Sequence, residues 1–77
     1  MRIQILGTGC PKCKQLAANV QQAVADLGLD AEIQKVTDLR EIAQAGVMMT
    51  PALVVDGEVK ASGKALSADQ IKQLLQH

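Results

Sequence analysis

The sequence predicts an α/β protein in which a four-stranded mixed sheet carries helices on both faces, in the order β-α-β-α-β-β-α. Three observations predict this class. Apolar residues alternate in short runs rich in β-branched side chains, and in longer segments they recur at helical spacing. An Asp-Gly pair at residues 56–57 separates two further strand-like runs. With 77 residues, we expect one domain over residues 1–77.

The first strand and the first helix are the most clearly marked elements. Residues 2–6, RIQIL, predict a strand in which Ile3 and Ile5 share one face. An amphipathic helix is predicted from Pro11 to about Leu27, because proline suits the first helical turn and Gly28 suits the end. The apolar positions that recur along this helix are Leu16, Val20, Val24 and Leu27.

A second strand and a short second helix follow. Residues 30–36 predict a strand parallel to the first, because a helical crossover joins the two and such crossovers are right-handed. Thr37 or Asp38 can cap a short helix that Gly46 ends. The side chains expected to point inward from this helix are Leu39, Ile42 and Ala43.

The last third of the chain predicts a hairpin and a final helix. Residues 52–55 and 58–62 form the two strands, since Asp-Gly is a strong signal for a two-residue hairpin turn. Ser67 is expected to cap the final helix. The apolar side chains of that helix are Ile71, Leu74 and Leu75.

Composition excludes several classes of function. Eight basic residues balance eight acidic ones and there is no aromatic side chain, so nucleic-acid binding is not expected. No apolar run approaches the length of a membrane span, and the apolar stretch near residue 1 is too short for a signal peptide. We therefore expect a cytoplasmic monomer, in a compartment where thiols are kept reduced.

The chemistry-bearing feature is the pair of cysteines at residues 10 and 13, placed where a strand turns into a helix. Unpaired N–H groups and the helix dipole favour a thiolate there. Cys10 is expected at the N-cap and Cys13 in the first turn, with Lys12 and Lys14 adding positive charge. The pattern favours a redox pair in which Cys10 attacks a substrate disulfide and Cys13 resolves the mixed disulfide, with no metal or organic cofactor.

Other interpretations of the pair stay open. Two thiols can hold Cu(I) or another thiophile as a carrier, although metal-carrier domains of this size end on a strand and usually have Met where Thr8 stands. The pair can also belong to an interaction module, or be two small buried side chains. Met48 and Met49 can form a copper or partner surface, but we expect them to fill gaps in the core. The one histidine, His77, is expected to be solvated.

The stretch Cys10-Pro11-Lys12-Cys13, followed by Thr50-Pro51 before the third strand, resembles the thioredoxin-like superfamily over essentially the whole chain. It is most similar to the small thioredoxin/glutaredoxin-like redox-active disulfide proteins of prokaryotes. This resemblance implies a cis peptide bond before Pro51, in a loop that faces the cysteines. It also implies that Thr50 offers backbone groups to a substrate, that Gly9, Pro11 and Lys12 complete the substrate groove, and that the partners are protein disulfides and an upstream reductase.

Some positions depart from that pattern. Thioredoxins usually have Trp before the first cysteine and Gly-Pro between the two cysteines. Here Gly9 precedes Cys10, and Pro-Lys stands between the cysteines. The buried acid of thioredoxins matches about Gln4, which cannot take a proton. The segment ASGKALS also lacks the acid with which glutaredoxins hold glutathione. The resemblance therefore leaves the physiological substrate open.

Overall fold

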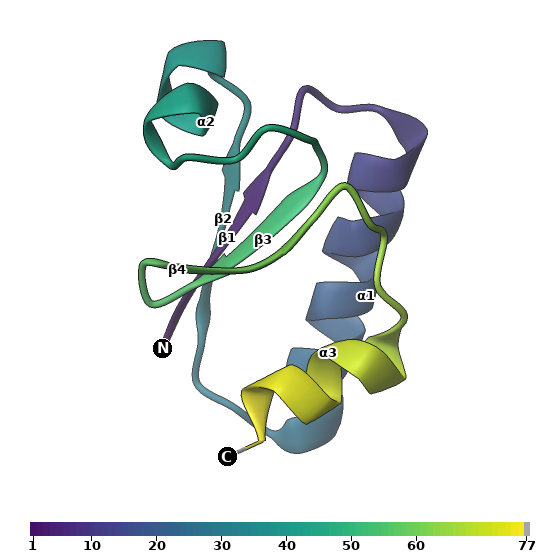
Figure 1. The fold of residues 1–77 in the computed structure, drawn as a ribbon. Helices are drawn as coiled ribbons and strands as arrows, with labels where there is room; N and C mark the ends of the chain where they lie inside the picture. Colours follow the sequence, from purple (N-terminus) through teal and green to yellow (C-terminus); the bar gives the residue numbers. More distant parts are fainter. Residues whose placement is uncertain (77) are drawn as a thin grey trace.

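A computed structural model describes residues 1–76, and it confirms the predicted fold class and element order (Figure 1). His77, expected to be solvated, lies outside the described residues. The strands are β1 (Arg2–Leu6), β2 (Glu32–Val36), β3 (Ala52–Val55) and β4 (Glu58–Ser62). The helices are α1 (Pro11–Leu27), α2 (Leu39–Gln44) and α3 (Ala68–Leu75).

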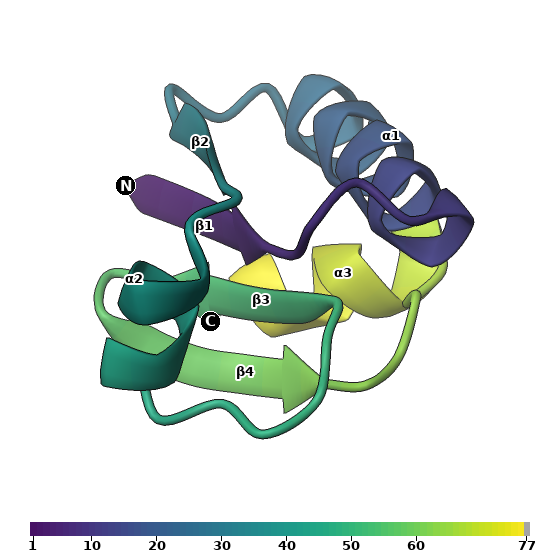
Figure 2. The same ribbon diagram turned by 90° about the horizontal axis from the view of Figure 1, so that it is seen from above.

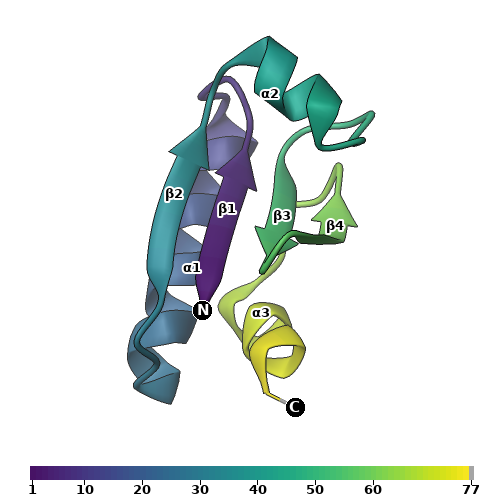
Figure 3. The ribbon, with the colours of Figure 1, turned by 90° about the vertical axis from the view of Figure 1, so that its left-hand side faces the viewer.

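The four strands form one mixed sheet in the order β2-β1-β3-β4 (Figure 3). As predicted, β1 and β2 are parallel and are joined through α1, whereas β3 is antiparallel to both β1 and β4. The second strand begins at Glu32 rather than at residue 30. The N–H of Glu32 donates a hydrogen bond to the carbonyl of Met1 at 2.9 Å. Because β1 is a central strand, its carboxyl end and the cysteines that follow it lie near the middle of one end of the sheet.

Helices cover both faces of the sheet, α1 and α3 on one side and α2 on the other (Figure 2). Alternation along β1 and β3 divides the core in the same way, because successive side chains of a strand point to opposite faces. The buried residues on the α1 and α3 side are Ile3, Ile5, Leu16, Ala17, Val20, Ala23, Leu53, Val55, Ile71 and Leu75. Those on the α2 side are Leu6, Val36, Ile42, Ala52 and Val54.

The helix ends follow from local side-chain chemistry. Gly28 ends α1 in the left-handed conformation at φ 64°, which glycine adopts without a steric penalty. Asp38 accepts a hydrogen bond from the N–H of Arg40 and so caps α2. Ser67 and Gln70 form a complete capping box at α3, which confirms the predicted start of that helix.

The predicted inward face of α2 is wrong at two of its three positions. Ile42 is 6% exposed and packs on the sheet, but Leu39 is 70% exposed and Ala43 is also exposed. A helix of only six residues presents little more than one side chain to the sheet, so the other apolar residues remain in solvent. The loop after α2 continues directly into the Thr50–Pro51 segment (Figure 1).

The core is aliphatic throughout. Among residues 1–76 no polar or charged side chain is buried, and the hydrophobic core contains only aliphatic side chains and Cys13. Within that same part of the chain, none of the helices combines the length and the apolar character that crossing a membrane requires.

Candidate active site: the dithiol at the start of α1

The two cysteines meet at the junction of β1 and α1. Cys10 is the N-cap of α1 and is partly exposed, whereas Cys13 lies in the first turn and is only 6% exposed. Their Sγ atoms are 2.6 Å apart, and both cysteines are free thiols. One thiol therefore faces solvent while its partner lies behind it, within reach for a bond.

The start of α1 creates this arrangement. Pro11 occupies the first helical position, and Cys10 adopts an extended backbone with φ −65° and ψ 164°. The carbonyl of Cys10 accepts the first helical hydrogen bond, from the N–H of Lys14 at 3.1 Å. The sulfur of Cys10 lies at the positive end of the helix dipole, which favours its thiolate form.

The pKa values of the two thiols move in opposite directions. A hydrogen bond from the Cys13 thiol, and then one from the Cys13 backbone N–H, lower the pKa of Cys10 below its ordinary value of 9.0. Burial, and then the same bond between the thiols, raise the pKa of Cys13. The exposed sulfur is thus the one that becomes a thiolate first, and the thiolate is the nucleophilic form of cysteine.

Gly7 packs against the side chain of Cys13, a role that the sequence analysis did not identify. A Cβ atom at Gly7 would collide with the Sγ of Cys13 and would lie 3.3 Å from its Cβ. It would also lie 3.9 Å from the Cα of Pro51, so Gly7 adjoins both the buried thiol and the proline loop. The two glycines in Gly-Thr-Gly look alike in the sequence, and nothing there distinguishes the one beneath the sulfur.

The loop before β3 lies next to this site. The Thr50–Pro51 peptide bond is cis, and the ring of Pro51 is fully buried. The carbonyl of Pro51 accepts a hydrogen bond from the N–H of Gly63 at 2.8 Å, which ties the loop to the segment after β4. Thr50 is exposed beside it.

Met48 and Met49 do not fill the core, so that prediction is wrong. Met48 is 96% exposed and Met49 is 63% exposed. Met49 lies over Gly63, since a Cβ atom there would be 3.1 Å from the Cβ of Met49. The branched side chains of the sheet and of α1 already fill the interior, so the methionines form an apolar surface on the loop that leads to Pro51.

A cavity of about 140 Å³ opens beside Cys13, on the side of the sheet that α1 covers. Ile5 and Ala17 form apolar wall, and Lys14, Lys35 and Thr37 add polar groups. No carboxylate lines it. Gln4, the expected match of the thioredoxin acid, is instead beside Gln34 at 3.4 Å on the other face of the sheet, so Ile5 is the β1 residue nearest this thiol cavity.

The other predicted groove residues are placed around the outward thiol. Gly9 is exposed and has a φ of 91°, a conformation that glycine tolerates best. Pro11 and Lys12 are exposed in the first turn of α1. These three residues are neighbours of Cys10 in the sequence, whereas Pro51 is distant in the sequence and lies near the site because of the tertiary structure.

The arrangement suits exchange of electrons between two sulfurs. A disulfide between Cys10 and Cys13 needs only a small movement, because the sulfurs are already adjacent. The two thiols are also soft ligands of the kind that bind Cu(I). Among residues 1–76 there is no group of three or more His, Cys, Asp or Glu side chains that could hold a metal ion.

Known proteins resemble this chain along nearly its whole length. The family model described as a thioredoxin domain matches residues 1–76. A thioredoxin of Methanothermobacter thermautotrophicus is 45% identical over 75 residues, which are 97% of this chain and 97% of that protein. A thioredoxin of Methanocaldococcus jannaschii is 51% identical over 73 residues, which are 95% of this chain and 84% of that protein.

Proposed function

The chain belongs to the thioredoxin family and is in general terms a thiol–disulfide oxidoreductase, and from this premise we propose that Cys10 attacks the substrate and Cys13 resolves it. The observation that carries the proposal is the asymmetry of the pair. Cys10 is partly exposed with a lowered pKa, while Cys13 is buried with a raised pKa, 2.6 Å behind it.

In the first step the Cys10 thiolate attacks one sulfur of a substrate disulfide. The bond between the two substrate sulfurs breaks, a bond between that sulfur and Cys10 forms, and the other substrate sulfur leaves as a thiolate that takes up a proton. The lowered pKa of Cys10 supports this role, because a larger fraction of the thiol is then ionised near neutral pH.

In the second step Cys13 attacks the sulfur of Cys10. Its thiol loses a proton, the mixed disulfide breaks, and the second substrate thiolate leaves. Two electrons have then passed from the dithiol to the substrate, and Cys10 and Cys13 are joined as a disulfide. Once Cys10 carries the substrate, its sulfur no longer accepts a hydrogen bond as a thiolate, so Cys13 is released for attack.

We further propose that the substrate lies in an extended conformation beside Thr50 and Pro51, with Gly9, Pro11 and Lys12 on its other side. Exposure of Thr50 and the position of Pro51 against Gly7 support this groove. The proposed partners are protein disulfides and an upstream reductase that restores the dithiol. The reaction as proposed takes place in the cytoplasm, in a single domain over residues 1–77, without a metal or organic cofactor.

A redox titration with a chelator present tests the proposed chemistry. The chain is equilibrated in thiol buffers of known potential, alkylated and weighed by mass spectrometry. We expect one two-electron transition between the dithiol and an intramolecular disulfide, with a midpoint to be compared with about −270 mV for thioredoxin. If no such disulfide forms at any accessible potential, the proposal fails, and Cu(I) binding becomes the question to measure.

Two variants test the roles of the individual thiols. Cys10→Ser should lose reduction of a protein disulfide, because the attacking sulfur is missing. Cys13→Ser should still attack and should accumulate a mixed disulfide that mass spectrometry detects. If Cys13→Ser reduces the protein disulfide as fast as the unchanged chain, the assigned roles are wrong.

A further inference from the structure

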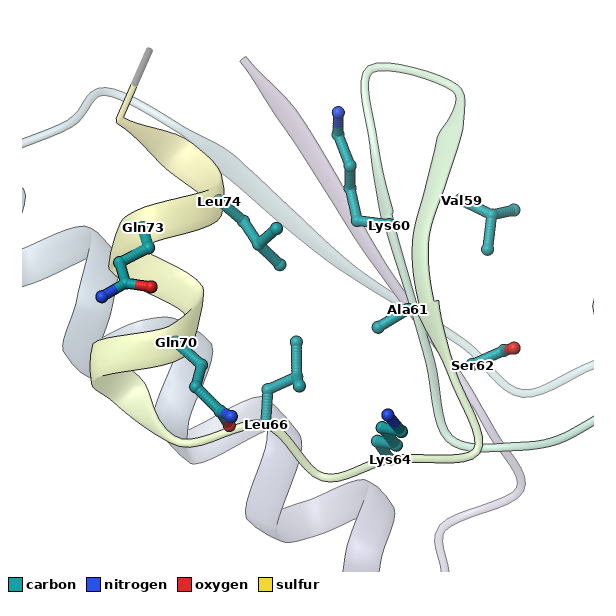
Figure 4. A pocket seen from close by; sticks show the side chains of 9 residues that line it. All are labelled: Val59, Lys60, Ala61, Ser62, Lys64, Leu66, Gln70, Gln73 and Leu74. Atoms are coloured by element: carbon teal, nitrogen blue, oxygen red, sulfur yellow. The ribbon is translucent and has the colours of Figure 1, made fainter.

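A second concave surface lies away from the thiols, between β4 and α3 (Figure 4). This β4–α3 groove is open and has a volume of about 530 Å³. Its side chains come from the edge strand, from the segment after it and from one side of α3. The residues that the argument uses are Lys60, Ala61, Lys64, Leu66, Gln70 and Leu74.

A bulge in β4 turns a lysine into this groove. The pairing register between β3 and β4 shifts, so that Leu53 opposes Ala61 and Val54 opposes Val59, which leaves Lys60 as the extra residue. A bulge changes the direction of a side chain. Figure 4 shows the result, in which Lys60 and Ala61 leave the strand on the α3 side and Val59 leaves it on the opposite side.

The groove combines an apolar floor with positive charge. Ala61, Leu66 and Leu74 point into the space between the strand and the helix (Figure 4). Lys60 and Lys64 bring two ammonium groups, and none of the lining residues is acidic. The carboxylate of Glu58 lies 3.3 Å from Lys60, whose side chain is 23% exposed, but the Glu58 side chain is 73% exposed, so a partner's carboxylate can take its place. In a chain with no net charge, the groove is a local excess of positive charge.

One end of the groove adjoins the thiol site. Lys64 directly follows Gly63, whose N–H donates to the carbonyl of Pro51. Gly63 is also the residue over which Met49 lies. A partner chain that passes Pro51 therefore meets Met49 and then the groove without leaving the surface of the molecule.

We propose that the β4–α3 groove binds an extended segment, rich in acidic and apolar residues, of the protein whose disulfide is exchanged. The inference rests on the proposed function for the identity of that partner. Its acidic side chains pair with Lys60 and Lys64, and its apolar side chains cover Leu66 and Leu74. The side-chain NH2 group of Gln70 supplies a donor for the partner's backbone, while its oxygen already accepts the N–H of Ser67. Such a contact sets which partner is chosen and how fast it associates.

The groove, rather than the free edge of β4, is the docking surface. A bulge and a lysine are devices by which edge strands avoid pairing with other strands, and β4 has both at Lys60. Addition of a second copy of this chain to β4 would have to place two such bulged edges together. Side-chain recognition within the groove needs no regular backbone ladder.

Nuclear magnetic resonance tests binding directly with the full chain. The probe is a short synthetic peptide of alternating glutamate and leucine, titrated into the isotope-labelled reduced protein. We expect amide shifts concentrated in β4, residues 63–66 and the first turns of α3, and weaker binding at higher salt. Shifts scattered over the surface, no shifts, shifts that report only self-association, or equal binding of a peptide with lysine in place of glutamate would overturn the proposal.

Charge variants locate the contact. Lys60→Glu and Lys64→Glu should each weaken peptide binding by about tenfold, because each loses an ion pair and gains a repulsion. The neutral variants Lys60→Met and Lys64→Met should weaken it less, and they serve if a reversed charge disturbs folding. Arg40→Glu is the matched control, since it makes the same charge change on α2, which covers the other face of the sheet, and should leave binding unchanged. Equal loss in Arg40→Glu would show a nonspecific charge effect.

A kinetic readout separates this inference from the proposed function. The same peptide, extended by a disulfide-bonded cysteine, is compared with a small uncharged disulfide as substrate. Lys60→Glu should raise the KM for the peptide disulfide and leave kcat and the reduction of the small disulfide unchanged. If neither substrate is reduced, the proposed function fails while peptide binding by the reduced chain still decides the docking surface. If the KM for the peptide is unchanged, the docking inference fails and the redox function stands.

Discussion

Replacement of Gly7 by alanine should disturb the buried thiol selectively. The new methyl group would occupy space that the Sγ of Cys13 fills and would lie 3.3 Å from the Cβ of Cys13. Gly7 is the one glycine of six that lacks a positive φ, so alanine causes no backbone strain there. The destabilising part of the effect therefore comes mainly from the contact with the sulfur.

The expected cost follows from two opposing contributions. Overpacking of a well-filled interior costs about 1–3 kcal/mol. Replacing glycine with alanine at a permissive position stabilises by about 0.4–1 kcal/mol through the unfolded state. The free energy of unfolding should thus fall by about 1–2 kcal/mol, and urea unfolding measures that change. Reduction of a protein disulfide should slow as well, because Cys13 must move away from Cys10.

A double-mutant cycle with Cys13→Ala decides whether the sulfur is responsible. Without Sγ, Gly7→Ala has only the 3.3 Å contact with a Cβ and an ordinary 3.9 Å contact with Pro51, so its cost should be close to zero. The coupling free energy between the two sites should be about 1–2 kcal/mol. If Gly7→Ala is equally costly in both backgrounds, the sulfur contact is not the cause, and this reasoning is refuted.

Three further predictions concern ionisation and capping. In Cys13→Ala the pKa of Cys10 should rise toward its ordinary 9.0, because the hydrogen bond from the Cys13 thiol, the largest cause of the lowered pKa, is lost. The pH dependence of iodoacetamide alkylation measures this change. Lys72 lies 2.7 Å from Asp26 and lowers its pKa, so their pair stabilises the fold above the ordinary Asp pKa of 3.8 and is lost as pH falls through the lowered value. Lys72→Met should therefore raise the pKa of Asp26, which carboxyl NMR measures, and should make the free energy of unfolding depend less on pH in acid. An unchanged pKa would contradict the pairing. Ser67→Ala should destabilise by about 1 kcal/mol in urea unfolding, since it removes the capping box, and a loss near zero would show that the cap contributes nothing.

Much of the fold is predictable from the sequence because its local signals agree with one another. Alternation in residues 2–6, the helical spacing after Pro11 and the Asp-Gly turn each predict an element that the structure contains. Gly28 and Ser67 mark helix ends through backbone freedom and side-chain capping, both of which act within a few residues. Interactions of such short range can be recognised without knowledge of the tertiary structure.

The incorrect predictions share a cause, which is that burial depends on distant parts of the chain. Leu39 belongs to an apolar pattern, yet a six-residue helix has no room to bury it. The absence of aromatic side chains suggested that Met48 and Met49 fill the core, but sheet and helix residues leave them no space. Alternation in β4 likewise gives no sign of the bulge that turns Lys60 toward α3.

The site shows the same division between local and distant effects. The positions of Cys10 and Cys13 at a helix start follow from the chain within a few residues of them. The residue facing Cys13 from β1 does not, because counting back to Gln4 is off by one position and a shift of one residue moves a side chain to the other face of a sheet. Ile5 lines the cavity instead, so an apolar wall and the lysines at its rim replace a carboxylate there.

The asymmetry of the dithiol is a property of the pair rather than of either residue. Burial, and then the hydrogen bond between the sulfurs, raise the pKa of Cys13, and the same hydrogen bond lowers the pKa of Cys10. Two protons that leave such a coupled pair do so in two macroscopic steps. The first ionisation gives an outward thiolate that the buried thiol stabilises, and the second ionisation takes place at higher pH. Two identical side chains thereby acquire different pKa values from their different depths in the fold, and on this difference the proposed order of attack and resolution rests.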